Sequence, residues 1–491
     1  MSSAFDVIVV GSGAGGAAAA SQLASVGVRV LLLEKGKRLP MDGSTLDVRK
    51  VVHDGRFKSR EVWRDGRGRA LVPEEYFNLG GKTKWYGAAL FRFGRHEFAA
   101  DAHHQALGWP ISYDDYAPYY ERAERRLDVK TFDCEADLAD ILDRVERRSQ
   151  WQHAPMPMGL ARTIRLNSIE ARHFDGFASI KRLKSDAETA FLSNAERLTI
   201  RTDANVVDLV GARDDARQIV GVRLADGETL LANHVVLAAG ALHSPRLLAR
   251  HLRAAKLDSS LPAAATVGRN LKLHLLTAVL AFSTSRKTDL IRKTTVLTHP
   301  AVPHSSVQPL GFDGEMLGTL IPGFVPRKIA DALGQRAYGF FLQTEDGSHA
   351  DNRVEPGVDG APSRFDYDAA RTPAALSEHR RLVRNFVASL MRAGYPAASK
   401  RIGRGGTAHA CGTLVTGSDP HRSVVDPSGR VHGMQGLYVA DGSVLPRSSR
   451  VNPSLTIYAW GLRLAELLAA SIHANGRSAA VGTEAEHEAA H

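Results

Sequence analysis

The chain has 491 residues, 44% hydrophobic and 24% charged, which exceeds one ordinary core and favours two joined domains of an α/β enzyme. The formal charge is +10, but the basic residues form no continuous arm, which argues against nucleic-acid binding. The chain has two cysteines, Cys134 and Cys411, too few for a disulfide framework or a paired-thiol zinc site. We therefore expect no metal, and we expect the protein to reside in a reducing compartment.

The N-terminus leads from Met1 almost directly into an apolar segment, without a basic region or a cleavage site. A secretory signal is therefore not expected. No run approaches the roughly 20 apolar residues that span a bilayer. These observations predict a cytoplasmic protein without a membrane span.

The first elements predict a dinucleotide-binding unit. Residues 6 to 10 (DVIVV) and 28 to 34 (VRVLLLE) have the pattern of buried parallel strands. Between them GSGAGG has the G-x-G-x-x-G spacing and opens an Ala-rich helix, whose free N–H groups suit a pyrophosphate, while an acid after the second strand suits a ribose hydroxyl. A glycine-rich turn between packed elements, the structural alternative, does not account for that acid. The cofactor-binding positions expected here are Gly11, Gly13, Ala14, Gly15, Gly16 and Glu34.

The position of this unit at the start of the chain favours FAD over NAD. Residues 39 to 74 lack periodicity and are predicted to form a loop. In residues 77 to 93 (FNLGGKTKWYGAALFRF) a Gly-Gly pair precedes Thr83; small residues would let the backbone lie flat against a planar ring, and the hydroxyl could donate to it. A tight turn into a strand is the alternative.

The middle of the chain predicts further elements of both domains. Residues 109 to 127 predict a helix that begins near Ser112 or Asp114, and residues 130 to 185 are expected to be irregular. Residues 197 to 251 predict strands and a Gly-turn-helix unit that return to the nucleotide sheet. Residues 275 to 400 alternate as in an antiparallel sheet, in which the neighbours Glu345 and Asp346 would point in opposite directions. A flexible tail is expected after residue 474.

Residues 408 to 456 carry the candidate chemistry. His409 stands before a Gly-Thr turn, and Asn452 stands before Pro453 and a helical pattern. A neutral histidine can accept a proton at physiological pH because its ordinary pKa is about 6.5. Asn452 could hold a hydroxyl, or its side chain could serve as the N-cap of the helix that Pro453 begins.

With these segments in order, the sequence resembles the glucose-methanol-choline (GMC) oxidoreductases, a family of FAD enzymes, and within it the bacterial choline-dehydrogenase-like group. The residues that carry the resemblance are VIVVGSGAGG, LLLEKG, LGGKTKWYGAALFRF, VVLAAGALHSPRLL, VGRNLKLH, HACGT, YVADGSVLP and VNPSLT. It covers most of the chain and is loosest between residues 275 and 400.

The resemblance implies a Rossmann-type FAD-binding domain (residues 1–110, 195–274 and 400–473) beneath an antiparallel-sheet substrate domain (residues 111–194 and 275–399). It implies His409 as catalytic base and Asn452 as the second active-site residue. It also places these further residues beside FAD: Gly81, Thr83, Val206, Asp441, Gly442, Pro453 and Ser454. The covalent link of some members uses a histidine near the Gly-Gly motif, and KTKWYG has none, which implies non-covalent FAD.

The expected activity is FAD-dependent oxidation of an alcohol group, on a sugar, glycoside, polyol or other alcohol, to a carbonyl. His409 would remove the hydroxyl proton, hydride would pass to flavin N5, and oxygen or another acceptor would reoxidise the flavin. A non-redox lyase on the same scaffold and a binding protein with a degenerate nucleotide site are the alternatives. The sequence does not distinguish an oxidase from a dehydrogenase.

Overall fold

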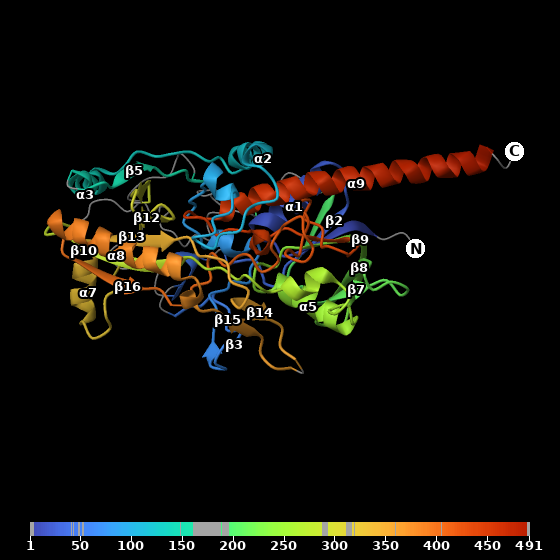
Figure 1. Cartoon of the computed structure of the whole chain (residues 1–491), viewed down its shortest axis with the longest axis horizontal. Helices are drawn as coiled ribbons and strands as arrows, with labels where there is room; N and C mark the ends of the chain where they lie inside the picture. Colours follow the sequence, from blue (N-terminus) through green and yellow to red (C-terminus); the bar gives the residue numbers. More distant parts are fainter. Residues whose placement is uncertain are drawn as a thin grey trace.

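The computed structural model describes residues 4–40, 42, 44–47, 50–51, 54–147, 149–160, 188, 196–286, 293–310, 317–318, 320–358, 360–403 and 405–488, with side chains as far as residue 474. Within these residues, two large sheets lie side by side along the long axis of the molecule (Figure 1). A smaller sheet lies between and below them in this view. The mixed α/β architecture with an antiparallel second sheet confirms the predicted fold class.

The first sheet has seven strands in the order β6-β2-β1-β9-β8-β7, and β17 also pairs with β9. The pairs among β6, β2, β1, β9 and β17 are parallel, whereas β7, β8 and β9 pair antiparallel. Because β1 and β2 are buried along much of their length, their sequences are nearly continuous aliphatic runs, and β9 has the same character at its buried end, residues 235 to 237. The strands are β1 (Phe5–Val10), β2 (Val30–Leu33), β6 (Leu198–Arg201), β7 (Val206–Gly211), β8 (Ile219–Leu224), β9 (Thr229–Leu237) and β17 (Leu437–Val439).

Helix α1 (Ala14–Ser25) connects β1 to β2 and packs against α9 (Ser454–Glu488). The small residues of α1, Ala17 to Ala20 among them, are fully buried, and this lets the two helices approach closely. Helix α2 (Tyr113–Arg126) also packs on α9, and α5 (Ser244–Ala254) packs on β7. Ser112 is the N-cap of α2, as predicted, because its hydroxyl accepts from the backbone N–H of Asp115.

The second sheet has six antiparallel strands in the order β16-β10-β13-β12-β11-β5. Helix α8 (Pro373–Arg392) packs on its β10, β13 and β16 strands, α7 (Arg327–Gly334) contacts β13, and α3 (Ala136–Glu146) contacts α8. The strands are β5 (Gln152–Pro155), β10 (Leu275–Phe282), β11 (Thr295–Thr298), β12 (Ser305–Pro309), β13 (Ala337–Thr344) and β16 (Ala397–Arg401). This sheet therefore brings residues 152 to 155 beside strands that follow more than 100 residues later.

The third sheet joins distant segments in the order β14-β15-β3-β4. It pairs β3 (Trp63–Asp65) and β4 (Ala70–Leu71) with β14 (Arg353–Glu355) and β15 (Arg364–Asp366). The prediction of loop throughout residues 39 to 74 is therefore wrong at these two short strands. It missed them because strands of two or three residues are too short to show a period.

Helix α9 differs from the prediction at its C-terminal end. The backbone is helical as far as Glu488, a length that the Ala- and Glu-rich composition after residue 474 did not lead us to expect. Within it, Ser454–Ala474 has a mean hydropathy of 1.3 and is long and apolar enough to cross a membrane, but 61% of that stretch is buried in the protein. Because core helices of soluble proteins pass the same test, this finding is weak evidence for a membrane span, which the sequence did not predict.

Candidate active site

A cavity of about 710 Å³ lies between the first and second sheets and draws its walls from both. This volume is in the range of small-molecule and cofactor sites. Every residue predicted for the site lines it except Gly16, which packs behind the loop. Those that line it are Gly11, Gly13, Ala14, Gly15, Glu34, Gly81, Thr83, Val206, His409, Asp441, Gly442, Asn452, Pro453 and Ser454.

The glycine loop forms one end of the cavity, and its glycines have different roles: some allow close packing of the backbone, and one leaves open space. Gly11 has φ +106°, and a Cβ there would lie 2.3 Å from the carbonyl oxygen of Ala238. At Gly15 and Gly16 a Cβ would lie 1.8 Å and 2.0 Å from backbone oxygens, so these two glycines permit the packing of α1. A Cβ on Gly13 would meet nothing within 4 Å. Gly13, the N-cap of α1, therefore leaves open space at a helix N-terminus, which fits the pyrophosphate of a dinucleotide.

Glu34 closes this end from the neighbouring strand. Its Oε2 accepts from the Ser12 hydroxyl (2.5 Å) and the Ser12 N–H (3.2 Å), and its Oε1 accepts from the N–H of Gly36 (2.9 Å). Burial raises the pKa of Glu34 against the effect of these bonds. The Ser12 hydroxyl also accepts from the N–H of Gly80 (2.9 Å), so one side chain ties the glycine loop, the acid and the Gly-Gly segment together.

The remaining predicted cofactor residues lie along the same wall. Gly81 and Thr83 belong to a short 3-10 helix, Gly81–Lys84, and a Cβ on Gly81 would lie 3.3 Å from Gly13 Cα. Val206 lines the cavity at the start of β7. Asp441 accepts from Gly240 N (2.9 Å), the Ser244 hydroxyl (2.5 Å) and Ser443 N (2.8 Å), and burial raises its pKa.

His409 and Asn452 meet at the other end of the cavity, as the resemblance implied. Asn452 Nδ2 lies 3.4 Å from His409 Nε2, and Asn452 Oδ1 accepts from Gln308 Nε2 at 2.7 Å. Helix α9 begins at Ser454, and the carbonyl of Pro453 accepts from the N–H of Ile457 (2.9 Å). Pro453 thus occupies the cap position, and the alternative of Asn452 as N-cap is wrong. Its amide faces Gln308 and the histidine instead.

His409 has a second imidazole behind it. His409 Nδ1 lies 2.6 Å from Nδ1 of His274. His274 is buried, whereas His409 is partly exposed to the cavity. Burial lowers the pKa of His409 well below its ordinary value, and the positive charges of Lys293 and Lys82 add to this effect. A neutral His409 can therefore act as a proton acceptor at neutral pH.

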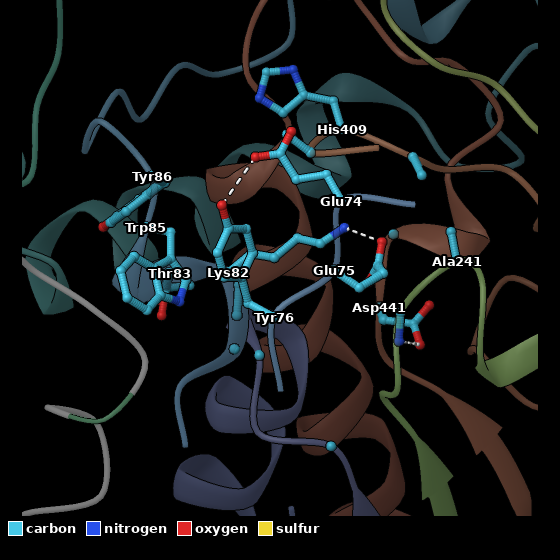
Figure 2. A pocket seen from close by; sticks show the side chains of 18 of the residues that line it. Glu74, Glu75, Tyr76, Lys82, Thr83, Trp85, Tyr86, Ala241, His409 and Asp441 are labelled. Atoms are coloured by element: carbon cyan, nitrogen blue, oxygen red, sulfur yellow. Dashed lines mark hydrogen bonds and ion pairs between the residues drawn. The ribbon is translucent and has the colours of Figure 1, made fainter. Parts of the chain in front are cut away.

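The sequence did not single out His274, Gln308 or the acidic wall of the cavity. His274 ends the segment VGRNLKLH, so its place after a turn and before β10 was the available signal. In Figure 2 the wall beside His409 carries Glu74, bonded to the Tyr76 hydroxyl (3.0 Å), and Glu75, paired with Lys82 (2.7 Å). Nothing in the sequence pattern marks these acids, which lie at the end of the predicted loop (Glu74) and just after it (Glu75).

Away from this cavity, the part of the chain that the structure describes contains one group of three side chains whose atoms could hold a metal ion: His104, His304 and Glu378. The two imidazoles stack with centroids 3.9 Å apart and planes 11° apart. Their in-plane lone pairs therefore run parallel and do not converge on one ion. His304 binds Glu345 (3.0 Å) and Asp101 (3.2 Å) through its two nitrogens, so this group forms part of an ion-pair network.

Comparison with known proteins gives a family for this arrangement. The N-terminal and C-terminal models of GMC oxidoreductases match residues 5–276 and 347–461. The 6'''-hydroxyparomomycin C oxidase of Streptomyces lividus is 29% identical, over 96% of this chain and 92% of that protein. The paromamine 6'-oxidase of Streptomyces fradiae is 28% identical, over 95% and 92%.

Solved structures support the fold. Pyridoxine 4-oxidase from Mesorbium loti has a TM-score of 0.66 and 18% identity, over 94% of this chain and 99% of that one. A formate oxidase variant from Aspergillus oryzae RIB40 has a TM-score of 0.68 and 14% identity, over 96% and 99%. At these identities the likeness concerns the fold alone.

Proposed function

The chain belongs to the GMC oxidoreductase family, and we propose that it oxidises an alcohol group of a sugar, glycoside or polyol to a carbonyl with non-covalently bound FAD. Family membership makes it an oxidoreductase that acts on CH–OH donors. The observation that carries the finer proposal is a single cavity with two unlike ends. An open helix N-terminus at one end fits a dinucleotide, and a partly buried imidazole beside an amide at the other fits an alcohol.

When bound, FAD supplies the hydride acceptor at flavin N5. The protein's part is to hold the hydroxyl and remove its proton. His409 Nε2 faces the cavity next to Asn452 Nδ2, so the imidazole takes the hydroxyl proton while the amide donates to the hydroxyl oxygen. A base positioned in this way is worth about 10²- to 10⁴-fold in rate. Gln308 fixes which end of the Asn452 amide faces the histidine, because its Nε2 binds the amide oxygen.

The walls around His409 suit a polyhydroxylated substrate. Three amide side chains line this part of the cavity, those of Gln308, Gln343 and Asn452. Apolar groups from the same sheet region complete the wall, including Leu310 and Phe341. Amides both donate and accept, as recognition of hydroxyl groups requires. The names of the two Streptomyces relatives, oxidases of 6'''-hydroxyparomomycin C and of paromamine, support an alcohol of the glycoside type.

Non-covalent attachment is proposed from the wall beside the Gly-Gly segment. The residues that line the cavity include two histidines, His243 and His409. Neither histidine belongs to the segment KTKWYG that follows the Gly-Gly pair, where family members with covalent FAD carry the linking histidine. His409 is the proposed base. Acid precipitation of the purified protein should therefore release all of the yellow flavin into the supernatant, whereas flavin that stays with the pellet would reject non-covalent binding.

An anaerobic flavin-reduction screen tests the activity. The purified yellow protein is mixed without oxygen with sugars, glycosides, aminoglycosides, polyols and aryl alcohols, and the visible flavin absorbance is followed. Loss of that absorbance with one class identifies the substrate, and the rate of its return in air separates oxidase from dehydrogenase. A lyase would turn over its substrate with the flavin still oxidised, and a colourless protein that FAD cannot reconstitute would reject the proposal.

A further inference from the structure

His274 contacts His409 but does not line the cavity. The two rings stand nearly perpendicular, with centroids 4.7 Å apart and planes at 85°. His274 is only 5% exposed. Any effect that it has on a substrate must therefore pass through the ring of His409.

The hydrogen-bond partners of His274 show which of its nitrogens carries hydrogen. Its Nε2 lies 3.1 Å from the carbonyl oxygen of Ser448 and 2.9 Å from that of Ser449. Carbonyl oxygens only accept, so Nε2 must be the protonated nitrogen. Burial lowers the pKa of His274, which keeps the ring neutral and leaves a lone pair on Nδ1.

The same reasoning extends to His409. At 2.6 Å one of the two facing Nδ1 atoms must donate, and His274 has only a lone pair to offer. His409 therefore carries its hydrogen on Nδ1, and its Nε2 holds the lone pair. The contact on the far side agrees, because Asn452 Nδ2, which can only donate, faces His409 Nε2 at 3.4 Å.

The two carbonyls that bind His274 belong to a turn under restraint, residues 447 to 450. Ser449 has φ +65°, a conformation that a serine rarely adopts without support. Its hydroxyl donates to Glu97 Oε1 (2.6 Å), and the N–H of Arg450 donates to the same oxygen (3.0 Å). Arg447 binds the buried carboxylate of Glu345 through two bonds, 2.7 Å and 2.6 Å. The turn is thus held from both ends with its carbonyls aimed at His274.

We propose that His274 is a positioning residue, which holds His409 in the tautomer whose Nε2 lone pair faces the cavity. The restrained turn orients His274, and His274 orients the base. Triads commonly use a carboxylate for this purpose, whereas here a neutral imidazole accepts the Nδ1 hydrogen. The catalytic consequence rests on the proposed role of His409 as base, but the tautomer is a property of the protein that can be measured without turnover.

The test is the protonation state of the His409 ring nitrogens in holoenzyme labelled with ¹⁵N-histidine, observed by NMR and assigned with His409→Asn. We expect hydrogen on Nδ1 and a lone pair on Nε2. His274→Leu should populate the form with hydrogen on Nε2 and slow flavin reduction by about 10²-fold or more at saturating substrate, with substrate affinity unchanged. Hydrogen on Nε2 of His409 in the wild-type protein would overturn the proposal.

Two further variants separate positioning from loss of packing. His274→Asn keeps an acceptor oxygen where Nδ1 stood and should recover most of the rate. His379→Leu removes another buried histidine of the same region, which binds Thr277 (2.8 Å) and Thr344 (3.0 Å), and should leave the tautomer and the rate unchanged. Equal losses in the His274→Leu and His379→Leu variants would also overturn the proposal. If the tautomer is as expected but His409→Asn reduces flavin at the wild-type rate, the proposed base falls and the tautomer assignment stands.

Discussion

One end of the cavity is formed mainly by backbone, and the other end is formed mainly by side chains. The glycine end is made by backbone, because Gly11, Gly15 and Gly16 allow chain segments to approach where any side chain would collide with a carbonyl. The His409 end is made by side chains, which are joined by hydrogen bonds from Gln308 to Asn452, from Asn452 to His409 and from His409 to His274. A substitution in the glycine loop should disturb packing and so lower FAD content and melting temperature. A substitution at the His409 end should leave both unchanged and lower the rate of flavin reduction.

The largest effect is expected from Gly15→Ala. Its Cβ would lie 1.8 Å from the carbonyl oxygen of Ala440, and backbone on both sides cannot yield without separating α1 from β17 and the segment after it. We expect loss of FAD from the purified protein and a large fall in melting temperature. The matched control is Gly13→Ala, whose Cβ meets nothing within 4 Å. It should fold normally and bind FAD more weakly, and equal behaviour of the two variants would contradict a ligand at this end.

The second largest effect is expected at the His409 end, on the rate of flavin reduction, in a variant that still folds. His409→Asn removes the proposed base but keeps a polar side chain of moderate size. Flavin reduction should slow by about 10²- to 10⁴-fold, while FAD content and melting temperature stay near those of the wild-type protein. Rapid-mixing measurements under anaerobic conditions give the rate. A variant that loses FAD would show that the two ends are not separable in this way.

A smaller effect is expected from Gln308→Glu. A carboxylate cannot donate to Asn452 Oδ1, so the amide should turn and present its oxygen to His409 Nε2, where two acceptors would face each other. We expect the rate of flavin reduction to fall by about 10-fold, because the loss of one hydrogen bond typically has an effect of this size. Gln308→Leu removes the contact without adding charge and is the control for electrostatic effects. Wild-type rates in both variants would show that Asn452 does not need Gln308.

These differences also explain what the sequence could predict. The glycine loop and Glu34 lie within one strand-helix-strand unit, so local spacing was enough to place them. His409 and Asn452 were identified through the family resemblance, since no spacing rule links residues 43 positions apart. His274 and Gln308 bind partners 135 and 144 positions away, and only the packing of the second sheet over the first brings them together.

Two differences from the prediction have local causes. Helix α3 lies in a stretch predicted to be irregular, although Leu138, Ile141, Leu142 and Val145 are buried at helical spacing; the polar residues around them obscure that pattern. The alternative of Asn452 as N-cap required Pro453 to be the first residue of the helix. The helix begins one residue later, which frees the amide for the active site.

The smallest effect concerns stability rather than rate, at two neighbouring acids. Glu345 and Asp346 follow the end of β13 and do not lie in a strand as predicted. Glu345 binds Arg447 and His304, and Asp346 binds Tyr367 and Thr372. Burial raises the pKa of both carboxyls, but the bonds to Arg447 and His304 bring that of Glu345 down to about 2, whereas that of Asp346 rises to about 6.

The signs of the two contributions are opposite. Glu345 stabilises the fold above its unfolded pKa of 4.5, and this contribution is lost as the pH falls towards 2. Asp346 contributes most below its unfolded pKa of 3.8, and this contribution is lost as the pH rises through 6. Denaturant unfolding at several pH values should show Glu345→Gln losing stability relative to wild type as the pH rises to 5. Asp346→Asn should gain between pH 4 and 6, on the order of 1 kcal/mol per pH unit at most. Parallel curves for both variants would contradict these assignments.

The most direct test of the two-ended cavity is the anaerobic rate of flavin reduction by a reactive alcohol, measured against pH for the wild-type protein and His409→Asn. Since burial holds the pKa of His409 low, the wild-type rate should stay constant from neutral pH to well below about 6.5. The variant, with equal FAD content, should be slower by about 10²-fold or more at every pH. Equal rates in the two proteins would contradict His409 as the base, and a wild-type flavin that no alcohol reduces would contradict the proposed activity.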